Sequence, residues 1–141
     1  MKVEEATHCD DTLLMGVNSL LPQLSSSAPS LSLSELQAII ESDTTHLLLA
    51  QEDDRILGTL TLVVFRIPTG VRAWIEDVVV SESSRGKGIG AALVEAAVSL
   101  AKEKGAKTID LTSRPTRKAA NRLYRAAGFE PRETNIYRLA L

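Results

Sequence analysis

The chain has little of several residue types on which common active sites depend. Cys9 is its only cysteine, so no disulfide can form within the chain. The only histidines are His8 and His46, and we therefore expect neither a metal site nor a nucleophilic cysteine–histidine pair. Aromatic residues make up 4% of the 141 residues, which argues against a pocket that recognises its ligand by stacking rings.

Long apolar runs and a strong charge of one sign are also missing. No stretch of about 18 apolar residues and no basic leader followed by an apolar segment is present, which predicts a soluble, cytoplasmic protein with no membrane partner. The net charge is −2 and the basic residues are scattered, so nucleic acid is not an expected partner. An apolar content of 44% over 141 residues supports one core, which predicts a single domain over residues 1–141.

Apolar periodicity and turn residues predict an alternation of helices and strands. Helices are expected over residues 10–21, stopped by Pro22, over 32–42, begun by a capping box of Ser32 and Glu35, and over 91–104 and 118–127. The expected strands cover residues 2–6, 46–52, 56–66, 72–80, 108–112, 129–130 and 135–141.

The order of these elements predicts a mixed sheet. The strand, helix and strand between residues 74 and 112 form a right-handed parallel crossover, whereas the three strands between residues 46 and 80 form an antiparallel meander. The fold class is therefore α/β or α+β.

The most informative segment joins the strand that ends at Val80 to the following helix. It contains Gly86, Gly88 and Gly90, beside the basic residues Arg85 and Lys87. Glycines allow backbone N–H groups to close on an anion, and the start of a helix favours negative charge. The segment therefore predicts a phosphate-binding loop.

One interpretation of this loop is a dinucleotide site. Gly86-x-Gly88-x-x-Ala91 satisfies the G-x-G-x-x-G/A pattern, and Asp110 follows 24 residues after Gly86, where an acid that binds ribose would lie. Against it, five residues separate Val80 from Gly86 instead of an immediate turn, and the chain has one crossover where a doubly wound sheet needs several.

The other interpretation takes Arg85-Gly-Lys-Gly-Ile-Gly90 as [Q/R]-x-x-G-x-[G/A]. The strand Trp74-Ile-Glu-Asp-Val-Val-Val80 precedes it, and Asn121-Arg-Leu-Tyr124 and Gly128-Phe129 follow. In this order the motifs resemble the GCN5-related N-acetyltransferase (GNAT) superfamily, from about Ile56 to Leu141. The resemblance implies a single GNAT-like domain of about six to seven strands, with a central splayed parallel pair and about four helices. It also implies acetyl-coenzyme A as cosubstrate and no metal.

The resemblance assigns roles to particular residues. Tyr124 would protonate the coenzyme A thiolate, and Asn121 would hydrogen-bond the pantetheine arm. The unpaired backbone of Val78, Val79 and Val80 would pair with pantetheine and the acetyl carbonyl. The pyrophosphate would be held by Arg85, Gly86, Lys87, Gly88, Ile89, Gly90 and Ala91.

A general base is expected on the strand before the loop. Strand alternation puts Glu76 on the face of Val78 and Val80 and puts Asp77 on the opposite face, so only one acid can point at the acetyl group. We choose Glu76 as the base, with Asp77 as the structural or substrate-binding alternative.

Together these features predict an N-acetyltransferase that moves an acetyl group directly to a primary amine of a small molecule in a ternary complex. A non-catalytic acyl-coenzyme A sensor is the alternative, followed by a minimal dinucleotide-binding domain. Acceptor identity should depend on residues 10–36 and 66–71. An exposed strand over residues 135–141 could pair two chains into a homodimer.

Overall fold

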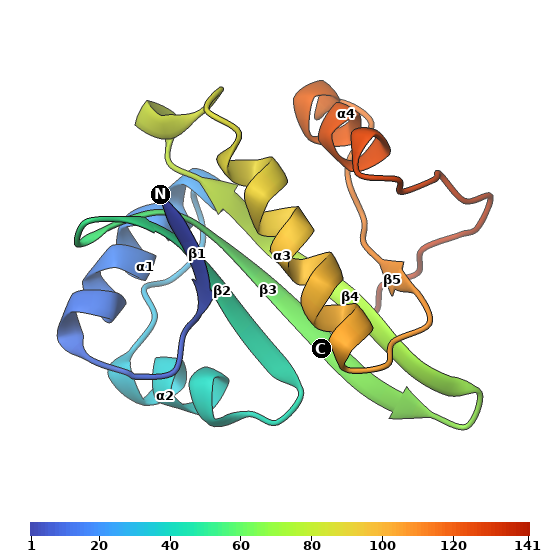
Figure 1. Ribbon diagram of the computed structural model, residues 1–141, viewed down its shortest axis with the longest axis horizontal. Helices are drawn as coiled ribbons and strands as arrows, with labels where there is room; N and C mark the ends of the chain where they lie inside the picture. Colours follow the sequence, from blue (N-terminus) through green and yellow to red (C-terminus); the bar gives the residue numbers. More distant parts are fainter.

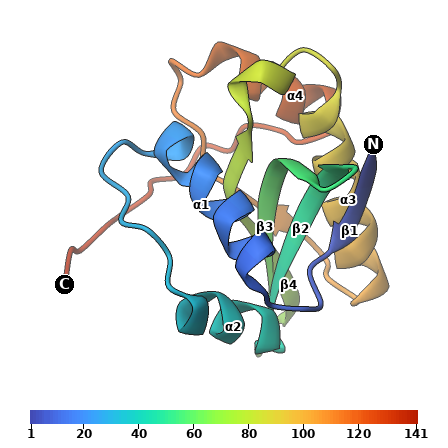
Figure 2. The same ribbon diagram turned by 90° about the vertical axis from the view of Figure 1, so that its left-hand side faces the viewer.

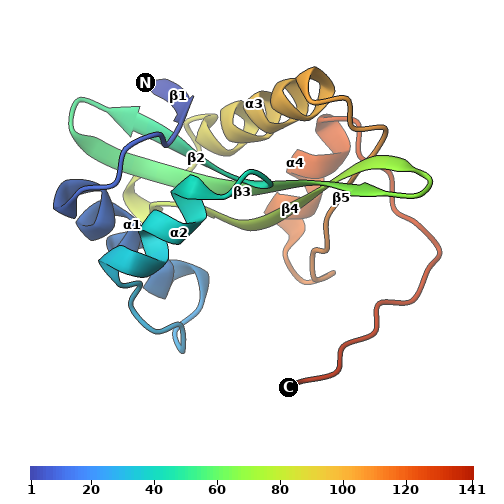
Figure 3. The ribbon, with the colours of Figure 1, turned by 90° about the horizontal axis from the view of Figure 1, so that it is seen from below.

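A computed structural model describes all 141 residues as a five-stranded sheet with helices on both faces (Figures 1 and 2). Helix α3 lies on one face, and α1 and α2 lie on the other (Figure 3). None of the helices is long and apolar enough to cross a membrane. The elements in chain order are β1 (Lys2–Glu5), α1 (Asp11–Leu24), α2 (Leu33–Glu41), β2 (Thr45–Glu52), β3 (Arg55–Ile67), β4 (Gly70–Val80), the 3-10 turn η1 (Glu82–Ser84), α3 (Ile89–Glu103), β5 (Ile109–Asp110) and α4 (Lys118–Ala126).

The sheet is mixed, as predicted. Its strands follow the order β1-β2-β3-β4-β5, with antiparallel pairing from β1 to β4 and parallel pairing between β4 and β5. The parallel pair is short, because only Ala73 and Trp74 of β4 have partners in β5, namely Ile109 and Asp110. Beyond Trp74 the two strands separate, which opens the sheet beside the second half of β4 (Figure 1).

Two apolar clusters hold the helices to the sheet. Under α3, the fully buried Leu93 and Val94 pack with Leu60 and Leu62 of β3. On the opposite face, the buried Leu36 belongs to a second cluster that also contains residues of α1 and β2. Because alternate residues of each strand face opposite sides, the central strands contribute to both clusters.

The C-terminal part differs from the prediction. β5 spans two residues instead of 108–112. The sheet has five strands instead of six to seven, because residues 129–141 form no strand. The parallel pair consequently lies at the edge of the sheet. A strand needs a neighbour for its backbone groups, and the last backbone hydrogen bond of the chain runs from Phe129 N to Tyr124 O at 3.0 Å.

The end of α1 also differs. The helix continues through Pro22 to Leu24. Proline lacks an N–H donor and its ring crowds the carbonyl four residues before it, but Pro22 lies in the last turn, which is closed beyond it by a 3.0 Å hydrogen bond from Ser25 N to Leu21 O. The capping box of Ser32 and Glu35 is present as predicted, and it lowers the pKa of Glu35 through hydrogen bonds from the backbone and side chain of Ser32.

Candidate active site

The site forms around a bulge in β4. Glu76 pairs with Thr61 of β3, but Val79 pairs with Thr59, so β4 has one more residue than β3 across this stretch. Asp77 absorbs the extra residue with a left-handed φ of 51°. Aspartate tolerates this conformation better than most side chains, because its short polar group can interact with the local backbone.

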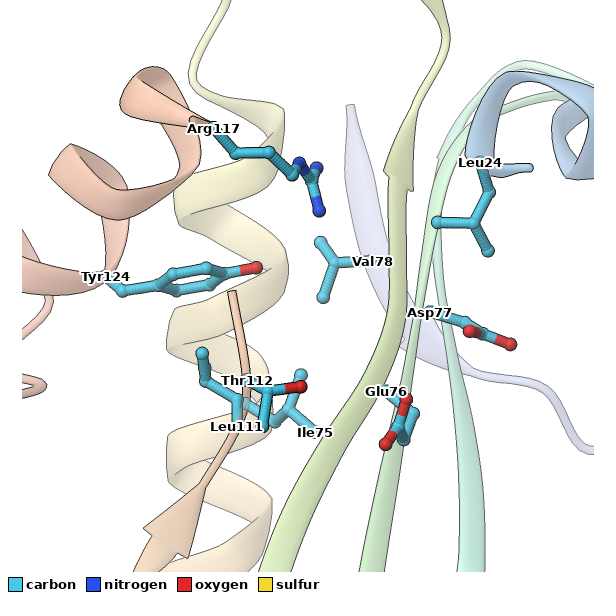
Figure 4. A pocket seen from close by; sticks show the side chains of 9 residues that line it. All are labelled: Leu24, Ile75, Glu76, Asp77, Val78, Leu111, Thr112, Arg117 and Tyr124. Atoms are coloured by element: carbon cyan, nitrogen blue, oxygen red, sulfur yellow. The ribbon is translucent and has the colours of Figure 1, made fainter. Parts of the chain in front are cut away.

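The bulge overturns the strict alternation expected from the sequence. After Asp77 the alternation shifts by one, so Val78 and Val80 pack against the cluster under α3 while Glu76 does not. The prediction that Glu76 shares a face with Val78 was wrong. Both acids instead line one cavity, although they are adjacent in sequence (Figure 4).

This cavity has a volume of about 150 Å³ and lies where β4 and the segment after β5 separate. Tyr124 and Arg117 approach it from one side of β4, whereas Asp77 and Leu24 lie on the other (Figure 4). The residues that line it are Leu24, Ile75, Glu76, Asp77, Val78, Leu111, Thr112, Arg117 and Tyr124. Thus Tyr124 and Glu76, the two residues with a predicted catalytic role, share one cavity.

The two acids have different surroundings. Glu76 Oε1 accepts a 2.7 Å hydrogen bond from the indole Nε1 of Trp74. Partial desolvation raises the pKa of Asp77 above its ordinary value, and the neighbouring charge of Glu76 adds to this rise. Glu76 is therefore held in place by the indole N–H of Trp74, whereas Asp77 is biased toward its protonated form.

Tyr124 is the buried aromatic residue of α4. It is 7% exposed and packs edge-on against Phe129, with ring centroids 6.0 Å apart. Burial raises the pKa of its phenol, while the positive charge of Arg117 partly offsets the rise. The hydroxyl points into the cavity toward Val78 (Figure 4), where it can act as a proton donor at neutral pH.

Asn121 lies one helical turn before Tyr124. Its Nδ2 donates 2.9 Å hydrogen bonds to the carbonyl oxygens of Arg114 and Arg117. These bonds fix the turn that begins α4. Asn121 therefore positions Arg117, and its amide nitrogen is already used by the chain.

The backbone N–H groups of the glycine loop, residues 86–91, have no backbone hydrogen-bond partner. No backbone N–H group from Gly86 to Ala91 donates to a backbone acceptor, and the first bond of the helix runs from Ala92 N to Gly88 O at 3.0 Å. Gly86 and Gly88 both have a φ of 79°, which favours glycine. Helix α3 starts at Ile89, two residues before the predicted start, with Gly88 as its left-handed cap.

The third glycine has a different role. A Cβ on Gly90 would lie 3.1 Å from Cδ2 of Leu123, so Gly90 lets α4 approach the start of α3. This contact keeps Tyr124 of the same helix near the glycine loop.

Two basic residues and the open edge of β4 complete the site. Arg85 and Lys87 form no salt bridge, so their charges are free for an anion. Arg85 Nε also donates to Val80 O at 3.3 Å, which links the loop to the strand. Val79 and Val80 pair with β3 on one side only, and no strand covers the other side of β4 beyond Trp74.

The structure adds residues that the sequence did not single out as site residues. Arg117 lines the cavity and was not among the predicted site residues. Leu24 reaches the cavity from the end of α1, within the segment expected to influence acceptor choice. Leu111 and Thr112 line the cavity because β5 ends early, and no local signal in the sequence indicated this.

Comparisons with known proteins agree with this architecture. A search of curated protein sequences found no match. Among solved structures, a protein of Agrobacterium tumefaciens is 23% identical and has a TM-score of 0.89, with 99% of this chain and 100% of that chain covered. An acetyltransferase of Trypanosoma brucei is 28% identical, with a TM-score of 0.77 and 99% of each chain covered.

A third similar structure is an aminoglycoside acetyltransferase from an uncultured soil metagenomic sample, solved in complex with sisomicin. It is 19% identical, with a TM-score of 0.86, and the match covers 99% of this chain and 96% of that chain. At this identity the likeness supports the fold alone. The family model described as the acetyltransferase (GNAT) family matches residues 15–129, and the chain therefore belongs to the acetyltransferase (GNAT) family.

Proposed function

We propose that the protein transfers an acetyl group from acetyl-coenzyme A to a primary amine of a small molecule. The observation that carries this proposal is that three parts needed for acyl transfer meet at the end of β4. They are the free amides of residues 86–91, the uncovered edge of β4, and a cavity that holds Tyr124 with two acids.

The residues fit the cosubstrate. The free N–H groups and the unpaired charges of Arg85 and Lys87 suit a pyrophosphate. A Cβ on Gly86 or Gly88 would meet no atom within 4 Å, so the surface beside these amides is open. The uncovered backbone of Val78, Val79 and Val80 can pair with an extended amide chain, as an added strand would.

Acetyl-coenzyme A, when bound, supplies the thioester whose acetyl group is transferred. Glu76 accepts a proton from the acceptor ammonium, directly or through water, so that the amine becomes nucleophilic. Tyr124 Oη donates a proton to the departing thiolate. The two residues approach the same cavity from different elements, which allows the two proton transfers to occur on opposite sides of the reacting carbon.

The acceptor suggested by the cavity is cationic. Glu76 and Asp77 place two carboxylates there against the single guanidinium of Arg117. The similar aminoglycoside acetyltransferase was solved with sisomicin, but its likeness supports the fold alone, so the charge of the cavity is what supports a small-molecule amine as the acceptor class.

The proposal is tested first by isothermal titration with acetyl-coenzyme A, with NAD as the competing ligand. Gly88→Trp blocks the loop, and Gly105→Trp is its matched control because Gly105 has a similar φ of 82°, open space around it and no place in the site. We expect binding of acetyl-coenzyme A that Gly88→Trp abolishes and Gly105→Trp preserves. Binding of NAD alone would support the dinucleotide site, and binding of neither ligand would contradict the proposal.

A non-catalytic acyl-coenzyme A sensor is the second candidate. The cavity volume of about 150 Å³ favours it, because small-molecule pockets usually have volumes of about 300–1,000 Å³. Release of free thiol over a panel of diamines, amino sugars and aminoglycosides separates the two functions. Turnover lost in Glu76→Gln and Tyr124→Phe supports the enzyme, whereas tight binding without turnover over the whole panel supports the sensor.

A further inference from the structure

A row of side chains leads away from the cavity along one face of β4. Arg72, Trp74 and Glu76 alternate with Ala73 and Ile75, which are buried in the cluster under α3. The pairing with β3 is regular over these residues, because the bulge lies beyond Glu76. The side chains of the row therefore lie on the face opposite α3, and about 13 Å separates the Cα atoms of Arg72 and Glu76.

This row is open to solvent. Arg72 and Trp74 are partly exposed, and Glu76 is exposed. Helices α1 and α2 cover the same face of the sheet farther from the β3–β4 hairpin, and the hairpin extends past both of them (Figure 3). A ligand that enters the cavity can therefore continue along β4 toward the hairpin.

Two cations meet at the hairpin end of the row. Arg72 Nη2 donates a hydrogen bond to Thr69 Oγ1 at 3.2 Å, and Lys107 Nζ donates one to Thr69 O at 3.4 Å. A Cβ on Gly70 would lie 3.2 Å from both Arg72 Nη1 and Lys107 Nζ, so the two cationic groups are close neighbours. Neither takes part in any of the three salt bridges of the protein. Thr69 thus holds two like charges together without a counter-ion.

The cavity end of the row has the opposite charge. Glu76 and Asp77 line the cavity. Asp110 of β5 is the register partner of Trp74, and it follows Ile109, which packs against the cluster under α3. Because neighbouring residues of a strand face opposite sides, Asp110 lies on the same face as Trp74. This face therefore changes from acidic near the cavity to basic at the hairpin.

From this arrangement we infer that the acceptor is an elongated primary amine with a carboxylate at its far end. Its ammonium group enters the acidic cavity, and its carboxylate presents one oxygen to each of the cations Arg72 and Lys107. Trp74 offers an apolar surface to the part between them. The cavity of about 150 Å³ then has to hold only the amine end. This role of the face depends on the proposed function and adds to it the chemistry of the acceptor's far end.

A pair of peptides of different length provides the test. Pentaglycine spans about 17 Å when extended, from its primary amine to its carboxylate, whereas diglycine spans about 7 Å. The C-terminal amide of each peptide is the matched acceptor without the negative charge. We expect kcat/KM for acetylation of pentaglycine to exceed that of its amide about tenfold, mainly through KM, and we expect no such preference with diglycine. Equal kcat/KM for pentaglycine and its amide would overturn the inference.

Variants connect this preference to the two cations. Arg72→Gln and Lys107→Gln should each remove most of the preference, by raising KM for pentaglycine. Lys104→Gln is the matched control, because Lys104 is exposed at the same end of the protein but lines a groove beside Leu100 on the α3 face. A preference that survives in Arg72→Gln and Lys107→Gln, or that Lys104→Gln removes equally, would mean that the carboxylate binds elsewhere and would overturn the inference.

Calorimetry separates the carboxylate site from the proposed function. Protein saturated with coenzyme A has no acetyl group to transfer, so titration with pentaglycine and with its amide measures acceptor binding alone. Tighter binding of pentaglycine that is lost in Arg72→Gln supports the site even where no acceptor is turned over. Equal binding of the two peptides, or binding of neither, overturns it, whereas acetylation of the amide would still support an acetyltransferase.

Discussion

The indole Nε1 of Trp74 donates a 2.7 Å hydrogen bond to Oε1 of Glu76, two residues along the same face of β4. Trp74 is also the last residue of β4 that pairs with β5, through Asp110. The donor that orients Glu76 is therefore anchored at the point where the sheet begins to open. This contact leaves Glu76 Oε2 free to face an acceptor.

Loss of this donor should impair turnover without affecting the cosubstrate. Trp74→Phe keeps an aromatic ring but removes the indole N–H, so Glu76 is less well oriented. We expect kcat to fall about tenfold in Trp74→Phe and about 10²-fold or more in Glu76→Gln, because a positioned base contributes about 10²–10⁴. Steady-state kinetics give kcat, and calorimetry should show the same acetyl-coenzyme A affinity in both variants. An unchanged kcat in Glu76→Gln would show that Glu76 is not the general base.

Asp77 should make stability depend on pH. Its pKa is raised in the folded protein by desolvation and by Glu76, so the folded state binds more protons than the unfolded state between the ordinary and the raised pKa. Stability therefore falls as pH rises through this window. Asparagine tolerates the left-handed φ of 51° and carries no charge.

We expect Asp77→Asn to be more stable than the wild type above this window, with the difference shrinking as pH falls below it. Urea unfolding at several pH values measures this difference. A matched substitution, Asp54→Asn in the turn between β2 and β3, should show no such trend, because that side chain is exposed and lies outside the cavity. A difference that grows toward low pH would contradict the assigned direction.

The sequence indicated the local features of this site but not those that depend on distant partners. The capping box at Ser32 and the free amides around Gly88 are properties of short segments, so their residue types predicted them. The bulge at Asp77 arises from the register between β3 and β4, which no local pattern encodes. The expected strand over residues 135–141 has the right alternation, but it lacks a neighbour within the chain.

Tyr124 should titrate at a higher pH than a free phenol. Burial raises its pKa and Arg117 opposes the rise, so Arg117→Gln should raise the pKa further. The chain has two tyrosines, and Tyr137→Phe leaves Tyr124 as the only phenol. Ultraviolet absorbance of the phenolate then follows Tyr124 alone.

Arg114→Gln is the control for that titration, because it removes a charge three residues before Arg117 that does not line the cavity. Tyr124→Phe should keep the ring contact with Phe129 at 6.0 Å and the thermal stability of the wild type. Its kcat should fall about 10²-fold, as for loss of a positioned acid. Wild-type turnover in Tyr124→Phe would assign the residue to packing alone.

A comparison of alanine variants at Gly88 and Gly105 distinguishes the effect of backbone strain from the effect on ligand binding. Both have a left-handed φ, 79° and 82°, and a Cβ at either position would meet no atom within 4 Å. Gly88→Ala and Gly105→Ala should therefore cost a similar free energy of unfolding, about 1–2 kcal/mol. Only Gly88 lies among the free amides of residues 86–91, so only Gly88→Ala should weaken acetyl-coenzyme A binding. Urea unfolding measures the free energy of unfolding of the two variants, and calorimetry measures their affinity for acetyl-coenzyme A. An equal loss of affinity in Gly88→Ala and Gly105→Ala would mean that the ligand does not bind at the glycine loop.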